Sequence, residues 1–323
     1  MRFYKIPTMY ASVGTGRSAT FGFQLDEPGD IDLRIRDTGS DRLLGGRRFV
    51  NVSQAEIDVA PRIRSAISFA PSTGLTGFKT SDDRVIMAGI EALRPGSETI
   101  ELSSGARRFL LGDQPLNSSR LLTAMPMNRL IPAGASDEIS IYHNRYCSFV
   151  VTATSRGTTV AEQYDSPQYG LQVFRLNTSD FPDCDTITVD TGVCGSIVYT
   201  VVPASQQAVR LAWLSHAGSI EHYSFPTLRE TTLRIDKQRA EGVDGDLLTA
   251  AETLSEKTLV SALESPEMLE TVAELTSARN VWVAGQNSYT PIDVLTDEAV
   301  IQRYGSLCAL ELVVRSKTAA SWS

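Results

Sequence analysis

Two Asp-Thr-Gly tripeptides are the residues of this sequence whose type and spacing most suggest catalysis. They begin at Asp37 and Asp190. Aspartic proteases activate water with two facing carboxylates that share one proton. The first tripeptide, however, follows Arg34-Ile-Arg36, and these cations would oppose the retention of that proton. Because Asp-Thr-Gly is also a frequent turn sequence in β proteins, we interpret both as turns and keep acid hydrolysis as the less favoured alternative.

The other side chains capable of chemistry are few and scattered. His216 and His222 flank a predicted turn with Glu221 nearby, but the protein ligands of a catalytic metal usually number three, and no third one is indicated. The sequence contains no Gly-x-Ser-x-Gly elbow, phosphate-binding loop or dinucleotide fingerprint. We therefore predict a protein without catalytic residues, cofactor or metal, which is not an enzyme.

The four cysteines are too few for a disulfide scaffold. Cys147 and Cys308 lie singly in apolar runs and are predicted to be core thiols. Cys184 and Cys194 flank a predicted hairpin that would bring them opposite each other. A bridge between them stays open as an alternative, disfavoured in a cytosolic setting.

Charge and hydropathy exclude several classes of function. The chain has 30 basic and 38 acidic residues, a formal net charge of −8, which argues against wrapping around nucleic acid. No apolar run is long enough to span a bilayer, and Lys5 and Pro7 interrupt the start of any signal peptide. All basic residues but five are arginines, which fits either a GC-rich genome or an arginine-rich protein–protein interface.

The pattern of apolar residues predicts a mainly β fold. Residues 31–36 alternate apolar and charged side chains, as expected of a strand with one buried face. Further strands are predicted at 48–52, 56–59, 65–69, 84–87, 107–111, 138–142, 169–174, 186–189, 196–202, 209–214 and 220–225. Turn residues separate them at short intervals, which is typical of sandwiches and barrels. At 323 residues, we predict two or more β-sandwich-like domains, 1–154 and 155–323.

A small helical insert is predicted near 246–278. Its two short helices would span 247–263 and 266–277. Ser265 is a suitable N-cap for the second, with Pro266 and Glu267 in its first turn. Strands at 280–283, 291–294 and 306–314 would then complete a sheet begun before the insert.

Three residues are predicted to contact partners. Arg107 and Arg108 form a basic pair that suits a neighbour's carboxylates, with a solvated strand end as the other explanation. Trp322, near the end of the sequence, is predicted to anchor on a partner. Trp282 and Tyr289 offer an alternative function, a sugar-binding platform, if both lie on one flat exposed face. Core packing is the competing explanation for Trp282.

Two segments, 210–226 and 280–294, are similar in their general residue pattern to β-rich virion proteins of tailed bacteriophages, from the tail, baseplate or neck. The similarity covers roughly residues 170–315. It implies a structural subunit that assembles with copies of itself in a ring or stack and with other virion proteins. We therefore expect the protein in the virion, assembled in the host cytoplasm, with no nucleic-acid reading and no membrane contact. The alternatives are a carbohydrate-binding or adhesive module and, less favoured, an aspartic-protease-like hydrolase.

Overall fold

The prediction of a mainly β protein is confirmed. The computed structural model describes residues 1–242, 245–317 and 320–322, with side chains at these positions except 82, 242 and 320–322. Among the described residues, strands make up 58% and helices 8%, in four sheets with two short α-helices. Within the described ranges, no helix is long and apolar enough to cross a membrane.

The N-terminal part of the chain forms a seven-stranded sheet around one long hairpin. The hairpin strands are β3 (Thr20–Asp37) and β4 (Arg42–Asp58). The sheet has the order β1-β3-β6-β8-β2, with β4 beside β3 and β7 beside β6. The remaining strands are β1 (Arg2–Lys5), β2 (Tyr10–Ser12), β6 (Val85–Leu93), β7 (Ile100–Ser103) and β8 (Arg107–Leu110). Ile31, Leu33 and Ile35 are buried in its core, which confirms the predicted alternation in β3.

The predicted strand at 65–69 is wrong. Helix α1 (Ala60–Ala66) occupies the start of this segment, and residues 67–69 are neither helix nor strand. Pro61 lies in the first turn, where its missing N–H costs no hydrogen bond. Ala60, Ile63 and Ile67 are buried in the core, and their helical spacing is the signal that the strand interpretation overlooked.

The middle of the chain forms a sandwich of two sheets. One sheet has the order β5-β14-β11-β9 and the other β10-β16-β15-β12-β13. Apolar residues from both inner faces, among them Ile141, Phe174 and Val189, make one core. The strands are β5 (Gly77–Lys79), β9 (Arg120–Leu121), β10 (Asn128–Pro132), β11 (Ser136–His143), β12 (Ser148–Ser155), β13 (Thr158–Asp165), β14 (Gly170–Asn177), β15 (Thr186–Asp190) and β16 (Ser196–Val202).

The C-terminal part forms a nine-stranded sheet covered by helix α2 (Pro266–Ala273). Its order is β18-β17-β21-β22-β24-β20-β19, with β23 beside β24 and β25 beside β20. The strands are β17 (Val209–Leu214), β18 (Ile220–Phe225), β19 (Thr227–Gly242), β20 (Gly245–Val260), β21 (Val281–Ala284), β22 (Tyr289–Val294), β23 (Ile301–Tyr304), β24 (Leu307–Ser316) and β25 (Ala320–Trp322). The strands after α2 thus complete the sheet begun before it, as predicted.

Of the two predicted helices in the insert, the second is confirmed and the first is wrong. Ser265 caps α2, its side chain accepting a hydrogen bond from the N–H of Met268 at 3.2 Å, and a short 3-10 turn continues it through Thr276. Residues 247–263, by contrast, lie largely in β20, which pairs with β19 along its length and with β24 at its base. Ladder hydrogen bonds on both sides outweigh the helix propensity of the Leu, Ala and Glu residues there.

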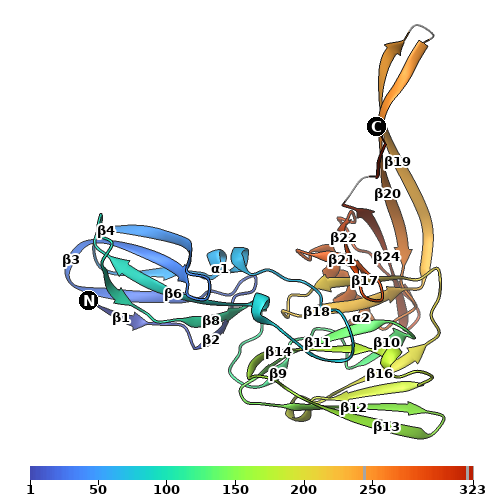
Figure 1. Ribbon diagram of the computed structural model, residues 1–323, viewed down its shortest axis with the longest axis horizontal. Helices are drawn as coiled ribbons and strands as arrows, with labels where there is room; N and C mark the ends of the chain where they lie inside the picture. The colour runs from blue at the N-terminus through green and yellow to red at the C-terminus, as the bar shows by residue number, and fades with distance from the viewer. Residues whose placement is uncertain (243–244, 318–319, 323) are drawn as a thin grey trace.

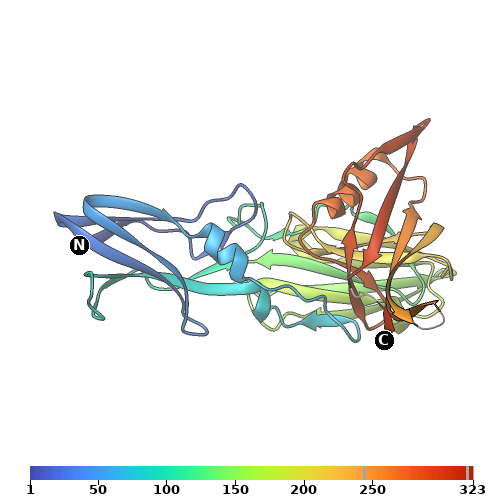
Figure 2. The ribbon, with the colours of Figure 1, turned by 90° about the horizontal axis from the view of Figure 1, so that it is seen from above.

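The four sheets form an elongated molecule. Figure 1 shows the seven-stranded sheet at one end and the β19–β20 hairpin projecting from the other. Seen from above, the seven-stranded sheet extends away from the other three (Figure 2). The predicted domain boundary at 154/155 falls at the end of β12, which pairs with β13 in one sheet. Independent folding of 1–154 and 155–323 stays a prediction.

Candidate functional site

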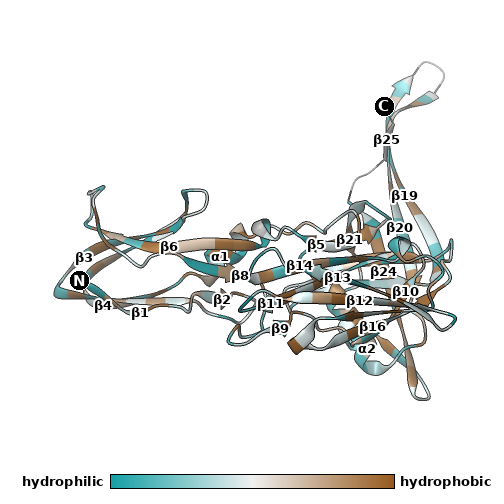
Figure 3. Cartoon of the chain, turned by 60° about the horizontal axis from the view of Figure 1, so that its bottom comes forward, coloured by the Kyte–Doolittle hydropathy of each residue, from teal (hydrophilic) through white to brown (hydrophobic). Residues whose placement is uncertain are grey.

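The most exposed secondary structure at the C-terminal end is the β19–β20 hairpin. Each strand has 16 residues, and residues 229–241 of β19 are all exposed. Four large apolar side chains lie open on it: Leu233 (58% exposed), Ile235 (51%), Leu247 (61%) and Leu248 (42%). Apolar residues therefore occur along the projecting hairpin as well as in the body (Figure 3). Several exposed apolar residues on one element commonly mark an interaction site.

The outer edge of β19 is open. Among the described strands, β19 pairs only with β20, so roughly every second backbone N–H and C=O of β19 points away from the sheet. Leu233 and Ile235 are two residues apart and therefore lie on the same face, opposite Ser255 and Thr253 of β20. An apolar stripe next to an open edge is a template for pairing with another strand.

The base of the hairpin is fixed to the body. Glu256 is buried, and Arg234 Nε lies 2.8 Å from its Oε1. Leu259 is fully buried in the C-terminal core, and Arg229 donates to Glu311 of β24. The hairpin is therefore anchored at its base. Farther out, among the described strands, β19 pairs only with β20, and β20 also pairs with β25.

A network of buried charges joins the C-terminal sheet to the central sandwich. Asp137 of β11 is 1% exposed. Its carboxylate lies 2.9 Å from Nδ1 of His222 on β18, 3.3 Å from Nη1 of Arg129, and 4.0 Å from Nη2 of Arg210. Arg129 also lies 3.4 Å from Glu221. These contacts connect β10 and β11 of the sandwich with β17 and β18 of the C-terminal sheet.

The neighbouring acid, Glu138 of β11, binds residues of the segment that follows α1. Arg84 donates to Glu138 with both terminal nitrogens, at 2.5 and 3.0 Å, and to the carbonyl of Ala70 at 2.7 Å. The N–H of Ser72 donates to the same carboxylate at 3.0 Å. The side chains of Arg84 and Glu138 are 2% and 0% exposed, so this is a bidentate pair removed from water.

A fourth arginine of this region, Arg175 of β14, is fully buried. It donates to the carbonyl of Gly74 at 2.9 Å, to Oγ of Ser136 at 2.5 Å and to Oη of Tyr289 at 3.1 Å. Because Tyr289 belongs to β22, Arg175 links the central sandwich to the C-terminal sheet a second time.

Opposing effects set the pKa values in this network. Burial alone would raise the pKa of Asp137, but His222 and the two arginines outweigh it and hold that pKa well below its usual range. Burial is likewise outweighed at Glu138, where Arg84 lowers the pKa. Burial raises the pKa of Glu221 and lowers that of His222.

The geometry of the buried network suits a structural role better than a catalytic one. Asp137, His222 and Tyr289 form a chain, since Nε2 of His222 lies 3.1 Å from the tyrosine Oη. A general acid or base must reach its substrate directly or through one water. The side chain of His222 is 0% exposed, with a carboxylate oxygen of Asp137 2.9 Å from Nδ1 and the hydroxyl of Tyr289 3.1 Å from Nε2. We therefore interpret the network as a clamp that fixes the C-terminal sheet, and with it the hairpin, against the sandwich.

Acidification is expected to destabilise the fold. The pKa values of His222, Asp137 and Glu138 lie below their ordinary 6.5, 3.8 and 4.5, so the unfolded chain takes up more protons. The free energy of unfolding should begin to fall as pH drops below 6.5 and fall more steeply below 4.5. Glu221 opposes this trend, because its pKa is raised. Denaturant titrations at pH 7.0, 5.5 and 4.0 test this; equal stability at all three would contradict it.

The predicted interface arginines contact their own chain. Arg107 donates to the carbonyls of Pro7 and Ala106 at 3.1 and 2.9 Å. The guanidinium of Arg108 lies over the Tyr10 ring, 5.4 Å from its centroid. Trp322 lies in β25, where its backbone is the register partner of Ala251, and its side chain is outside the described part. A contact of any of the three with another subunit stays a prediction.

The structure does not bring the two Asp-Thr-Gly sequences together. Asp37 ends β3 of the seven-stranded sheet, and Asp190 ends β15 of the sandwich. Each carboxylate accepts a backbone N–H two residues on, from Gly39 and Gly192, at 2.9 Å. Both tripeptides are turns, as the sequence indicated, and the proposed catalytic pair does not form.

The other candidate groups are also separated or buried. Trp282 is 6% exposed and packs in a small apolar cluster, so the predicted flat platform with Tyr289 does not exist. His222 is buried and His216 is exposed, and among the described residues no cluster of three or more His, Cys, Asp or Glu could hold a metal ion.

The four cysteines are free. Thr186 pairs with Thr200 and Asp190 with Ser196, so the hairpin turns at 191–195. Cys184 and Cys194 therefore lie at opposite ends of β15, and the hairpin does not bring them together.

Sequence reasoning missed both the buried network and the exposed hairpin. The network joins residues more than 80 positions apart, such as Asp137 and His222, and no local pattern reveals such pairs. The hairpin had a signal, because the alternation in Thr231-Thr-Leu-Arg-Ile235 precedes Asp244-Gly245, a dipeptide favoured in hairpin turns.

Comparisons with known proteins add little. No protein-family model matches the chain, and no curated protein matches it. Among solved structures, 63% of the chain aligns with 99% of a chain in the crystal structure of Dpr2 Ig1-Ig2 in complex with DIP-Theta Ig1-Ig3, at 12% identity and a TM-score of 0.18. A similarity this low supports no argument about fold or function.

Proposed function

We propose that this chain is a structural assembly subunit of a tailed-phage virion, of the tail, baseplate or neck, that acts through protein–protein interfaces without catalysis. Its partners are copies of itself in a ring or stack and other virion proteins. The assignment to a virion comes from the sequence similarity of residues 210–226 and 280–294 to such proteins. The assignment to assembly comes from the β19–β20 hairpin.

The observation that carries the proposal is the exposed apolar stripe on an open edge. Leu233 and Ile235 are each more than half exposed, and β19 pairs only with β20 among the described strands. A 16-residue strand extends about 50 Å. An open edge of that length favours aggregation unless another chain covers it. Ordered assembly provides such a cover, through strand pairing with side chains packed on the adjacent face.

The buried clamp supports the same function. A subunit in a ring must present its contacting elements at a fixed angle for the ring to close. The contacts of Asp137 with His222 and Arg210, and of Arg129 with Glu221, join the sheet that bears the hairpin to the central sandwich. The hairpin is therefore presented by a rigid body.

The proposal is tested by the mass of the purified protein in solution. Mass photometry and negative-stain electron microscopy at micromolar concentration should show a discrete multiple of 35.2 kDa in a closed ring or regular stack. A single species of 35.2 kDa over the whole concentration range would contradict the proposal.

A further inference from the structure

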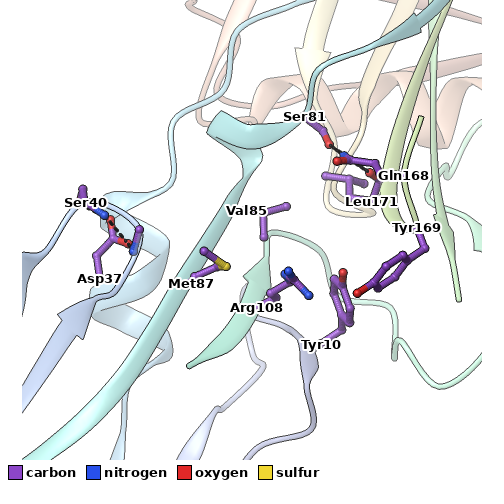
Figure 4. A pocket seen from close by; sticks show the side chains of 11 residues that line it. Tyr10, Asp37, Ser40, Ser81, Val85, Met87, Arg108, Gln168, Tyr169 and Leu171 are labelled. Carbon is purple, nitrogen blue, oxygen red and sulfur yellow. Dashed lines mark hydrogen bonds between the residues drawn. The ribbon is translucent and has the colours of Figure 1, made fainter. Parts of the chain in front are cut away.

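A cleft of about 510 Å³ lies between the seven-stranded sheet and the central sandwich. Tyr10 of β2, Met87 of β6 and Arg108 of β8 line it from one side, and Gln168 and Tyr169 from the segment before β14 line it from the other (Figure 4). Its volume is within the range of small-molecule sites, about 300–1,000 Å³. Neither the hairpin nor the buried clamp contributes to it.

Arg108 gives the cleft a positive charge that is free of an ion pair. None of the ion pairs in the described part of the chain involves its guanidinium. The acid that lines the cleft, Asp37, is engaged elsewhere, because it accepts the hydroxyl of Ser40 at 2.6 Å and the N–H of Gly39 at 2.9 Å. A half-buried guanidinium of this kind is suited to bind a carboxylate through two parallel hydrogen bonds.

The position of Arg108 is fixed by the tyrosine beneath it. Tyr10 packs edge-on against Tyr142, with ring centroids 5.3 Å apart. Its hydroxyl lies so close to Gly170, at φ +98°, that a Cβ there would be 2.5 Å from it. Only glycine therefore lets β14 approach this ring. Arg108 lies on a platform that is in place before any ligand arrives, which reduces the entropy lost on binding.

One lining residue of the cleft, Tyr169, is an exposed aromatic ring. Its side chain is 50% exposed, and its ring packs edge-on against that of Tyr146, with centroids 6.3 Å apart. Such rings offer apolar faces together with a polar hydroxyl. Ser40 and Gln168 add hydroxyl and amide groups to the lining. One cation, one acid, neutral polar groups and aromatic faces match a ligand with a single carboxylate and many hydroxyls better than a multiply charged acidic peptide, which Asp37 would repel.

We propose that this cleft binds an acidic saccharide, a sugar that carries a carboxylate, with the carboxylate on Arg108 and a sugar ring against Tyr169. This binding function goes beyond assembly and does not depend on it. It is distinct from the platform predicted at Trp282 and Tyr289, which does not form because Trp282 is buried.

Isothermal titration with galacturonate, a sugar with one carboxylate, and its neutral counterpart galactose tests the proposal. The protein should bind the acidic sugar about tenfold more tightly, the effect expected of one charge-assisted contact. Arg108→Gln should abolish that preference. Tyr169→Ala, at an exposed position, should weaken binding of both sugars, whereas Tyr304→Ala, at an exposed tyrosine of β23 (56% exposed), should change neither.

Three outcomes would overturn the proposal: no binding of galacturonate at millimolar concentration, an unchanged preference in Arg108→Gln, or tighter binding of tri-glutamate than of galacturonate. The measurement is separable from assembly, because a monomeric protein that binds galacturonate would refute the assembly function alone, and an assembled one that does not would refute the saccharide site alone.

Discussion

Glu138→Gln is expected to destabilise the protein by about 3–5 kcal/mol, because it leaves the buried charge of Arg84 without its counter-charge. Both side chains are 2% exposed or less and share two hydrogen bonds. Water cannot replace the lost partner at such a site. The free energy of unfolding, measured by denaturant titration at pH 7, gives the result.

Two further variants show that the effect comes from the buried charge. Arg84→Met combined with Glu138→Leu removes both charges and should recover much of the lost stability. The matched control is Glu311→Gln, which breaks the pair with Arg229 on the surface, where the arginine side chain is 57% exposed, and should cost less than about 1 kcal/mol. A loss below 1 kcal/mol for Glu138→Gln would show that the buried Arg84–Glu138 pair contributes little to stability.

Leu233→Glu combined with Ile235→Glu is expected to weaken assembly by at least about 100-fold, because it places two charges in the apolar centre of the contact. Both side chains are exposed in the isolated chain, so the fold itself should be unaffected and the unfolding midpoint of the subunit should be retained. Mass photometry over a dilution series measures the shift from assembly to monomer.

The control for this experiment is Leu75→Glu, which introduces one negative charge at an apolar residue that is 69% exposed and lies in the loop before β5. It should assemble like the unmodified protein. Dissociation by Leu75→Glu to the same degree, or full assembly of the double variant, would show that the hairpin is not the contact.

Most strands could be predicted from alternation alone, because a half-buried strand carries its burial pattern in its sequence. Ile31, Leu33 and Ile35 are buried as expected. Helix α2 could likewise be predicted from the N-cap Ser265 and from the spacing of Leu269 and Val272. These features depend on neighbours within a few residues.

The features that could not be predicted depend on residues that are distant in the sequence. β20 has the composition of a helix, and only its pairing with β19 and β24 makes it a strand. Asp137 and Glu138 look like solvent-facing acids in sequence, yet all eight residues of β11 are buried, because the C-terminal sheet and the connection after α1 cover the outer face of this strand. Arg108 was singled out by its charge, but the cleft around it is formed by segments some 60 positions apart.

The buried clamp and the exposed hairpin are structurally linked. Buried ion pairs hold the C-terminal sheet against the sandwich, the base of β19 and β20 is anchored in the core of that sheet, and the distal half extends from the molecule with apolar residues exposed. The energy of the buried contacts thus fixes the direction of a surface that the isolated chain leaves open.

Hydrogen–deuterium exchange along residues 229–241 tests the central claim most directly, because it reports on the edge of β19 itself. In the assembled protein, the outward-facing amides of this segment should be protected, and dilution or the Leu233→Glu, Ile235→Glu variant should remove that protection while the core amides of β17 stay unchanged. Equal and rapid exchange of these amides at every concentration would contradict the account.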